Sequence, residues 1–187
     1  MKIITGSAKG RALETLPGDA TRPTGAKIKE AVFSALQFDL EGRAFLDLFA
    51  GCGQMGLEAL SRGAGSAMFV DASRDAIDVV KRNAQKTGLF GASRFLVSDF
   101  RNYIRKAKGE GRFHIVYIDP PYREKWVKDA ISLLLKAELL YPGALIVTES
   151  AEEDIFEGEM PEGLSLLKQK RYGIAVITIL RYEPLAL

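Results

Sequence analysis

The sequence is poor in the residues that cross-link small proteins through disulfide bonds or metal ions. It contains one cysteine, Cys52, and one histidine, His114, among 187 residues. A single cysteine cannot form a disulfide bond within the chain, and one cysteine with one histidine is too few for a Cys/His zinc site. We therefore expect a fold that depends on its apolar core, with no bound metal ion.

Long hydrophobic segments are also missing. No apolar run approaches the roughly 20 residues that a membrane-spanning helix needs, and the first residues lack the basic, apolar and small-residue pattern of a signal peptide. Hydrophobic residues make up 47% of the chain and charged residues 27%, proportions typical of soluble globular proteins. These features predict a cytoplasmic protein that does not enter a membrane.

Charge of one sign is not in large excess. The formal net charge is +2, which by itself is too small to indicate a nucleic-acid-binding protein. Residues 1–29, however, contain six lysines and arginines against Glu14 and Asp19, a local excess of +4. A basic leading segment suits a phosphate-rich partner, although a solvated basic surface explains the charge equally well.

The leading segment has the pattern of an arm. Gly6 and Gly10 predict a small hairpin or an extended arm over residues 3–16 rather than a helix. We therefore divide the chain into residues 1–40, a basic arm with a helix, and residues 41–187, the main domain.

The arm leads into a predicted helix. Thr24 is a suitable N-cap for a helix that runs to about Phe38. Its apolar residues, such as Ile28, recur at helical spacing. Lys27 and Lys29 are expected to point away from at least part of that apolar face.

From Arg43 onward, strand and helix patterns alternate. The first five predicted strands span residues 44–49, 66–70, 94–97, 113–118 and 144–148. Two further strands, 164–171 and 174–182, are joined at Tyr172-Gly173 as a hairpin. This order predicts an α/β fold of the Rossmann-like type. We expect a mostly parallel seven-stranded sheet with a C-terminal antiparallel hairpin and a small N-terminal arm.

Four successive strands of the predicted sheet end in or next to an aspartate. These residues are Asp47, Asp71, Asp99 and Asp119. Because ligands of open α/β sheets bind beyond the carboxyl ends of the strands, the four carboxylates should line one rim of a binding site. Clustered carboxylates are costly unless ligands satisfy them, so the pattern predicts a ligand at this edge.

The first of these aspartates opens a glycine-rich turn, Asp47-Leu48-Phe49-Ala50-Gly51-Cys52-Gly53, which precedes a predicted helix. Gly51 and Gly53 let a ligand approach the backbone, and the helix N-terminus favours an anion. Gly56 completes the G-x-G-x-x-G spacing of dinucleotide-binding proteins, so a nicotinamide-dependent enzyme is the first alternative.

The acidic residues favour a different cofactor. Asp71 can accept hydrogen bonds from two ribose hydroxyls in either case. Asp47 suits a ligand ammonium group, which a dinucleotide lacks, and Asp99 suits an adenine amine. S-adenosylmethionine combines a carboxylate, an ammonium group, a ribose and an adenine. Ala72 and Phe100, beside these aspartates, complete the predicted cofactor-binding set.

The last aspartate belongs to the stretch Ile118-Asp119-Pro120-Pro121-Tyr122, which follows a buried strand. Two consecutive prolines stop the strand and fix the backbone, leaving a carboxylate and free carbonyl groups at its tip. Such a tip can hold a flat ring that bears an amine, because the ring can stack on Tyr122. The amine can then donate to Asp119 and to the Pro120 carbonyl. A plain strand end with a stiff turn is the simpler explanation of these four residues alone.

The motifs together resemble those of a known family. Asp-Leu-Phe-Ala-Gly-Cys-Gly, Val70-Asp71, Ser98-Asp99-Phe100 and Asp-Pro-Pro-Tyr occur in the order found in class I S-adenosylmethionine-dependent methyltransferases. With Thr21-Arg22-Pro23-Thr24 and the basic arm, the chain resembles the bacterial RsmD family from Gly6 to Tyr182. Cys52 stands where many relatives have serine, a change that we expect to be silent.

The resemblance implies a substrate and a mechanism. RsmD enzymes methylate the exocyclic N2 amine of one guanine in 16S ribosomal RNA, so we expect 16S RNA or the assembling small subunit as partner. The oligomeric state is open from the sequence, and a monomer is the default expectation. Asp119 and the Pro120 carbonyl would hold the attacking nitrogen, Pro121 would stiffen the tip, and Tyr122 would stack on the base. The residues expected to contact RNA are Lys9, Arg11, Arg22 and Lys27.

Two alternatives stay open at this point. An adenine-N6 methyltransferase of DNA or RNA would use the same Asp-Pro-Pro-Tyr tip, because the tip fits either amine. A non-catalytic RNA-binding assembly factor could keep the fold, but it would have no need of the Asp119 carboxylate.

Overall fold

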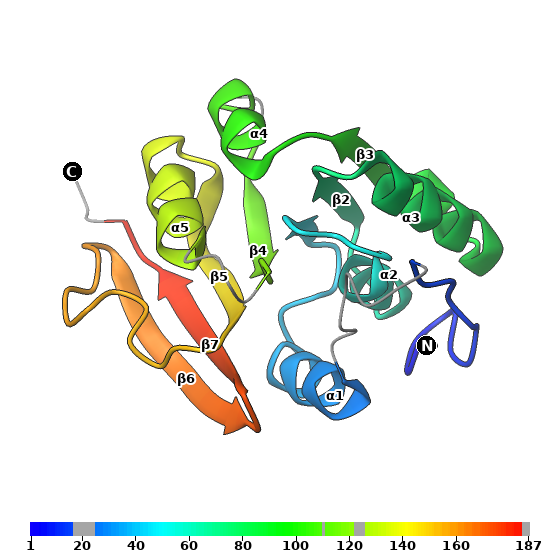
Figure 1. Ribbon diagram of the computed structural model, residues 1–187, viewed down its shortest axis with the longest axis horizontal. Coiled ribbons are helices and arrows are strands. Elements are labelled where there is room, and N and C mark those ends of the chain that lie inside the picture. Colours follow the sequence, from blue (N-terminus) through cyan, green and yellow to red (C-terminus); the bar gives the residue numbers. More distant parts are fainter. Residues whose placement is uncertain (17–24, 110, 122–125, 185–187) are drawn as a thin grey trace.

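The computed structural model of the chain describes residues 1–16, 25–109, 111–121 and 126–184. Its strands are β1 (Ala44–Asp47), β2 (Ser66–Asp71), β3 (Ser93–Val97), β4 (Phe113–Ile118), β5 (Leu140–Ser150), β6 (Leu164–Tyr172) and β7 (Ala175–Tyr182). Within the described ranges they form one seven-stranded sheet of order β3-β2-β1-β4-β5-β7-β6 (Figure 1). The strands β1 to β5 are parallel, and β7 runs antiparallel between β5 and β6. The predicted α/β, Rossmann-like fold with a C-terminal hairpin is confirmed.

The helices cover both faces of the sheet. They are α1 (Ala26–Ala35), α2 (Gln54–Ser61), α3 (Arg74–Thr87), α4 (Phe100–Lys106) and α5 (Trp126–Lys136), with a short 3-10 helix η1 (Phe90–Ala92). The first three pack with the arm against one face, and α4 and α5 pack against the other. The strand order reverses between β1 and β4, and ligands of such sheets bind at this reversal.

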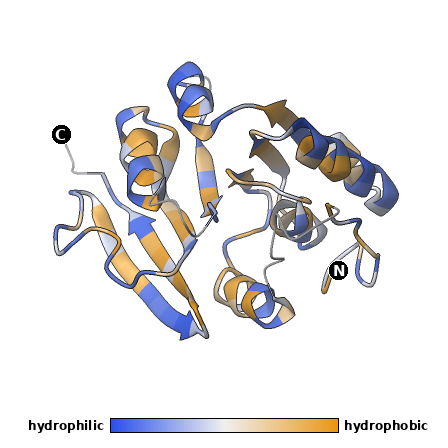
Figure 2. Ribbon diagram, viewed as in Figure 1, coloured by the Kyte–Doolittle hydropathy of each residue, from blue (hydrophilic) through white to orange (hydrophobic). Residues whose placement is uncertain are grey.

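Alternation along the central strands explains why both faces are covered. On β4, Tyr117 belongs to the core under α1 to α3, whereas Val116 and Ile118 belong to the core under α4 and α5. Successive side chains of a strand point to opposite faces, so a continuously apolar strand needs cover on both. Figure 2 shows the complementary pattern on α3, whose outer side is hydrophilic.

Local signals set the ends of α3 as the sequence predicts. The Ser73 hydroxyl accepts a hydrogen bond from the Ala76 N–H at 3.3 Å, which satisfies one of the unpaired donors of the first turn. Gly88 ends the helix with φ of +77°, a left-handed conformation that glycine adopts without strain.

Helix α1 differs from the prediction at both ends. Its N-cap is Gly25, which makes no side-chain capping bond, and its last residue is Ala35 instead of Phe38. Thr24 lies outside the described residues. The helix therefore depends on its packing, with Val32 and Phe33 buried in the core beneath it.

The arm forms the predicted hairpin. The Ile3 N–H donates to the Arg11 carbonyl at 3.0 Å, and the Gly10 N–H donates to the Ile3 carbonyl at 2.9 Å. Gly6, with φ of +87°, packs so closely on α2 that an added Cβ would lie 1.7 Å from the Ser61 carbonyl oxygen. Ile3 is fully buried in the same core as the sheet. The hairpin is thus fastened to the main body through apolar packing.

One prediction for this segment is wrong. Lys29 was expected to point away from part of the apolar face, but its side chain is only 2% exposed. Its Nζ donates to the Lys2 carbonyl at 2.7 Å and lies 3.3 Å from the Glu58 carboxylate. Burial lowers the pKa of Lys29, while the Glu58 charge acts in the opposite direction. The helical pattern did not reveal this because the arm, a tertiary neighbour, lies over that side of α1.

Two further observations complete the fold. Strand β5 is longer than the predicted 144–148 at both ends, reaching from Leu140 to Ser150. Among the described residues, no helix combines the length and the apolar character required to cross a membrane.

Candidate active site

The four strand-end aspartates lie along one edge of the sheet. Asp47 and Asp71 are the last residues of β1 and β2, Asp119 directly follows β4, and Asp99 caps the helix that follows β3. Because the strand order is β3-β2-β1-β4, the aspartates follow one another along the carboxyl edge as Asp99, Asp71, Asp47 and Asp119. The sheet thus brings together residues that are spread over 73 positions of the sequence.

Asp47 is the most buried of the four. Its side chain is 1% exposed, and its Oδ2 accepts a hydrogen bond from the Gly56 N–H at 3.0 Å. Burial raises the pKa of Asp47 to about 7; the Gly56 hydrogen bond opposes this shift and the nearby charge of Asp71 adds to it. Near neutral pH, a cationic ligand beside this carboxyl would therefore stabilise its ionised form.

Asp71 ties two turns together. Its Oδ2 accepts from the Gly51 N–H at 2.9 Å, and its Oδ1 accepts from the Ser73 N–H at 2.8 Å. A carboxylate can accept about four hydrogen bonds, so both oxygens can still accept from ligand hydroxyls. Ala72, beside it, is exposed to solvent at the same edge.

The glycine turn leaves space above the backbone. Gly51 has φ of +54°, and a Cβ added there would meet nothing within 4 Å. Gly53 also has a positive φ, +79°, but a Cβ there would lie 2.7 Å from Val80. Gly56 packs against Phe69, whose ring would lie 2.3 Å from an added Cβ. Gly51 therefore faces open space, whereas Gly53 and Gly56 allow helix α2 to pack closely.

Asp99 caps α4. Its Oδ1 accepts from the N–H groups of Arg101 and Asn102 at 2.9 and 3.3 Å. The carboxylate is half-buried, and its remaining lone pairs can accept from a ligand amine. The next residue, Phe100, is buried.

An aromatic cluster that the sequence analysis missed surrounds Phe100. Its ring centroid lies 5.1 Å from that of Phe49 and 5.6 Å from that of Trp126, and the guanidinium of Arg101 lies 4.4 Å above its ring. Phe49 lies inside the glycine-turn motif, and Trp126 is the single tryptophan, at the start of α5. Their positions in or near the predicted motifs were the signal in the sequence that could have identified them as site residues. The cluster gives the edge near Asp99 an apolar wall.

The proline-stiffened tip follows β4. Asp119 is half-buried, Pro120 is buried and Pro121 is exposed. Tyr122 lies outside the described residues, so its stacking role stays a prediction. Pro120 lines a cavity of about 210 Å³, together with the end of β5, the segment after it and the start of α5.

A second cavity, of about 510 Å³, lies between the arm and α1. Lys9 and Lys29 line it, as does Gln54, the first residue of α2. The buried Oε1 of Gln54 has no hydrogen-bond partner within the described part of the chain. Gln54 was not predicted as a site residue, although its place between Gly53 and Gly56 marks it as close to the glycine turn.

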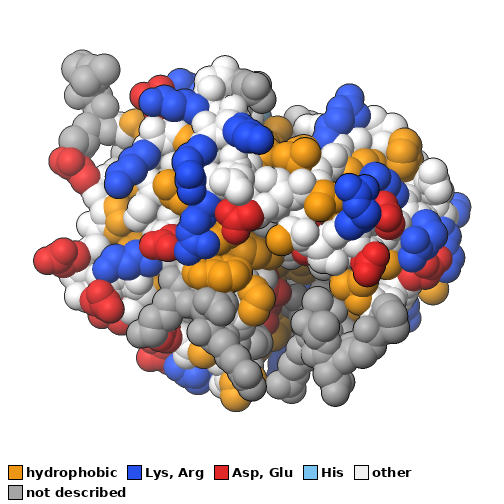
Figure 3. Space-filling view, turned by 45° about the horizontal axis from the view of Figure 1, so that its top comes forward, with side chains coloured by type: hydrophobic (Ala, Val, Ile, Leu, Met, Phe, Trp, Pro, Cys, Tyr) orange, Lys and Arg blue, Asp and Glu red, His pale blue; other side chains and the backbone are white. Residues whose placement is uncertain are grey.

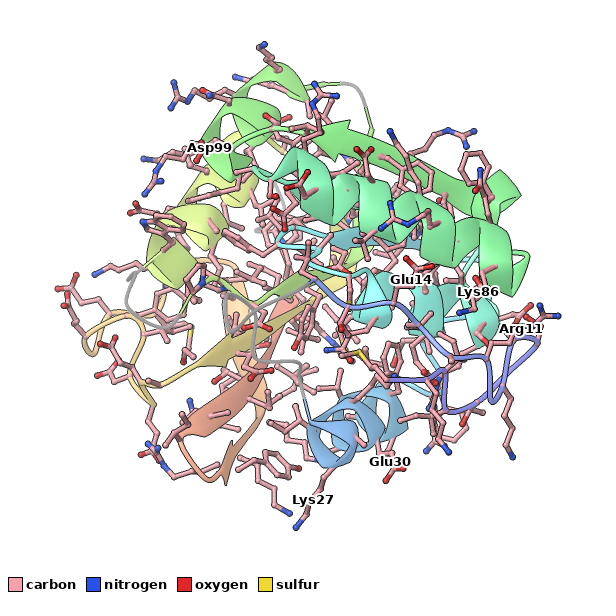
Figure 4. The ribbon with its side chains drawn as sticks, turned by 45° about the vertical axis from the view of Figure 1, so that its right-hand side comes forward. Arg11, Glu14, Lys27, Glu30, Lys86 and Asp99 are labelled. Atoms are coloured by element: carbon pink, nitrogen blue, oxygen red, sulfur yellow. The ribbon has the colours of Figure 1, made fainter. Side chains whose placement is uncertain are left out.

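The four residues predicted to contact RNA are not equivalent. Lys9 and Lys27 are exposed, and Lys27 points into solvent from α1 (Figure 4). Arg11 is also exposed, but its Nη1 donates to the Lys86 carbonyl at 2.8 Å, beside the end of α3 (Figure 4). Arg22 lies outside the described residues. Arg11 thus helps to hold the arm against α3.

Positive charge is not confined to the arm. Arg105, Lys106, Lys108 and Arg112 are exposed at and after the end of α4. On the face drawn in Figure 3, lysine and arginine side chains lie on both sides of an apolar centre. This second concentration of charge was not predicted, because only the leading segment stands out against a net charge of +2.

Comparisons with known proteins agree over almost the full chain. The Cons_hypoth95 family model, described as conserved hypothetical protein 95, matches residues 1–181. YlbH of Bacillus subtilis (strain 168), provisionally named an rRNA methyltransferase, is 36% identical over 96% of this chain and 97% of its own length. Ribosomal RNA small subunit methyltransferase D of Escherichia coli (strain K12) is 32% identical over 92% of this chain and 85% of its own length. The solved structure of Escherichia coli yhhF, provisionally described as a methyltransferase, has a TM-score of 0.87 and 31% identity over 99% of both chains.

Proposed function

We propose, since this chain belongs to the conserved hypothetical protein 95 family, that it methylates the exocyclic N2 amine of a guanine in 16S ribosomal RNA with S-adenosylmethionine as donor. The observation that carries the proposal is the row of four carboxylates along the carboxyl edge, from Asp99 to Asp119. The curated relatives that are named as methyltransferases of ribosomal RNA support the substrate class.

The described residues fit the donor. The open space at Gly51 admits the ligand to the backbone, and the buried Asp47 carboxyl suits its ammonium group. Asp71 can accept from the ribose hydroxyls and Asp99 from the adenine amine, beside the buried ring of Phe100. S-adenosylmethionine supplies a methyl group on a positively charged sulfur, which leaves as a neutral thioether when a nitrogen takes the methyl.

The tip after β4 is proposed to hold the acceptor. The lone pair of an exocyclic amine is delocalised into its ring, so the amine is a weak nucleophile. Asp119 and the Pro120 carbonyl would accept its two N–H bonds and turn the lone pair toward the methyl group. The charge of Asp119 would also offset the positive charge that develops on the nitrogen. The nitrogen loses its extra proton to solvent after the transfer, so the reaction needs no strong base.

The substrate must present its base outside a helical stack. Stacking on Tyr122 would add about 1–3 kcal/mol, the value found for bases on aromatic side chains in single-strand binders. We propose that residues 1–40 form the RNA-contacting extension of the methyltransferase domain 41–187, with Lys9 and Lys27 exposed for phosphate contacts. We further propose that the enzyme acts as a monomer in the cytoplasm, where ribosomal subunits assemble.

The test is to incubate the protein with labelled S-adenosylmethionine and small ribosomal subunits, or their RNA, from cells that lack it. We expect label on N2 of one guanine in 16S RNA, and label that forms at least about 100-fold more slowly with the Asp119→Ala variant. Label on adenine, on large-subunit RNA, or on no RNA at all would contradict the proposal. Comparing naked RNA with assembled particles would identify the form of the substrate.

A further inference from the structure

A buried acidic residue stands next to the proline-stiffened tip, and the mechanism above does not use it. Ile118 on β4 is in register with Thr148 on β5, so Asp119, directly after β4, is beside Glu149, the penultimate residue of β5. Neighbouring strands lie about 4.8 Å apart. The side chain of Glu149 is therefore close to the position where the acceptor amine is proposed to bind.

The surroundings of Glu149 hold it in a fixed orientation. The residue is 4% exposed, and its Oε2 accepts a hydrogen bond from the Tyr117 hydroxyl at 3.0 Å. The Ser150 hydroxyl donates to the Glu152 carbonyl at 2.7 Å, which fixes the start of the segment that follows β5. A buried carboxylate held by a second side chain is suited to recognising a ligand group at a defined angle.

Glu149 and Pro120 line the same cavity of about 210 Å³. Val127, Ala151 and Ile155 give this cavity apolar walls. Charged and polar residues, among them Lys128, Asp129 and Glu152, line the rest of it, so the cavity combines an apolar wall with groups that can hydrogen-bond a ligand. A single water occupies about 30 Å³ of liquid, so the cavity exceeds what one or two waters need.

The two candidate bases differ at the edge that would meet this carboxylate. Guanine carries a hydrogen on N1 beside its N2 amine, whereas adenine carries a lone pair on N1 beside its N6 amine. An ionised carboxylate accepts hydrogen bonds and donates none. It would therefore attract the N1–H of guanine and repel N1 of adenine.

We propose that Glu149 is a specificity-determining residue, which accepts the guanine N1–H while Asp119 and the Pro120 carbonyl hold the N2 amine. This inference rests on the proposed function and deepens it, because it selects guanine over adenine. Tyr117 acts as a positioning residue through its hydrogen bond to Glu149.

The test uses RNA in which the mapped target guanine is replaced by 2,6-diaminopurine through splinted ligation. This base keeps the N2 amine but carries a lone pair on N1 in place of the hydrogen and an amine in place of O6, so the Glu149 variant decides whether N1 is the group that is read. We expect the wild-type kcat/KM for guanine to exceed that for diaminopurine by about 5- to 150-fold, the range of one good bidentate base contact.

Glu149→Gln should reduce or reverse this preference, because the glutamine amide can donate to the N1 lone pair. Tyr117→Phe, which keeps the ring but removes the hydroxyl, should weaken it to a smaller extent. The matched control is Glu159→Gln, an exposed acid in the same segment after β5, which should keep the wild-type ratio. Binding of S-adenosylhomocysteine and thermal melting would show that each variant is folded.

The outcomes separate the two proposals. A wild-type protein that methylates no guanine contradicts the proposed function itself. A wild-type protein that methylates guanine and diaminopurine equally overturns the role of Glu149, even if Glu149→Gln does not fold. A preference that Glu149→Gln leaves unchanged, or that follows Glu152→Gln instead, overturns it as well.

Discussion

Glu58 and Asp47 are equally buried, yet their surroundings differ completely. Glu58 is 0% exposed, and its oxygens accept from the N–H groups of Ile4 and Thr5 and pair with Lys29 and Arg62. Asp47 is 1% exposed and accepts from one backbone N–H, that of Gly56. Burial alone therefore does not tell a structural acid from a ligand-binding one.

The partners make the difference. The cations and backbone donors around Glu58 come from the arm, α1 and α2, so the carboxylate joins three segments of the framework. Around Asp47 no cation is described within pairing distance, and burial raises its pKa to about 7. The first arrangement is complete within the chain, whereas the second would be completed by the cationic ligand proposed above.

The largest expected effect is the loss of stability when the charge of Glu58 is removed. Glu58→Gln keeps the shape but leaves Lys29 buried without a counter-charge, which should lower the free energy of unfolding by about 3–5 kcal/mol. Urea denaturation measures this loss. The control is Glu14→Gln, which removes an exposed pair with Arg82 and should cost no more than about 1 kcal/mol. Equal losses for both variants would mean that the Glu58 cluster is no stronger than a surface pair.

The second largest effect is expected on the rate of methyl transfer, when Asp119 in the proline-stiffened tip is changed. Asp119→Ala should lower kcat by about 10²- to 10³-fold, as removal of one preorganised transition-state contact does. The affinity for S-adenosylhomocysteine should stay within about twofold of the wild-type value, because Asp119 is assigned to the acceptor. Calorimetry and methyl-transfer rates give both numbers. Parallel losses of both in a folded variant would argue for a cofactor-binding role instead.

Asp47 should make cofactor binding depend on pH. Its folded-state pKa of about 7 lies above the ordinary value of 3.8, so ionisation is incomplete near neutrality. Affinity for S-adenosylhomocysteine should rise by about tenfold between pH 6 and 8, as the carboxylate forms, and should fall only at more alkaline pH, where the ligand's amino-acid amine loses its proton. Asp47→Asn should bind more weakly and lose the rise. A rise that persists in Asp47→Asn would assign it to another group.

The raised pKa of Asp47 also determines how the stability of the ligand-free protein changes with pH. A carboxyl whose pKa is raised on folding binds its proton more tightly in the folded state. Its contribution to the free energy of unfolding is fully present below about pH 4 and is lost as the pH rises through about 7. Asp47→Asn should therefore flatten this part of the stability profile, which thermal melts across the range would record.

The smallest effect concerns the arm. Lys27→Ala should weaken RNA binding and reduce the slope of log affinity against log salt by about 0.7, the value for one single-strand phosphate contact. Between 50 and 200 mM salt this amounts to about a two- to threefold change. The comparison variant is Lys106→Ala, on α4 at the opposite face of the sheet. Unchanged affinity at low salt in Lys27→Ala would remove it from the interface.

The sequence predicted the fold where its signals are local. Ser73 and Gly88 define α3 because a capping hydroxyl and a left-handed glycine act within a few residues of the helix. The aspartates could be placed on one edge because parallel strands share a direction. Lys29, in contrast, was misplaced, because its partner Glu58 lies 29 residues away in the sequence.

The candidate site was predicted only in part for the same reason. Asp47, Asp71 and Asp119 are recognisable because each ends or directly follows a strand within a motif. Glu149 lies one residue before the end of β5, but its proposed role depends on the neighbouring Tyr117 and on the pairing of β4 with β5. No spacing along the chain records that pairing.

The register of β1 and β4 has a further consequence. Asp47 pairs with Tyr117, so Asp119 stands two residues farther along, about 7 Å beyond it. A slip of β4 by one residue would turn Tyr117 and Ile118 toward the wrong cores, and both layers oppose it. The distance between the residues proposed to bind the donor and those proposed to bind the acceptor is thus set by the packing of the two apolar cores on either face of the sheet.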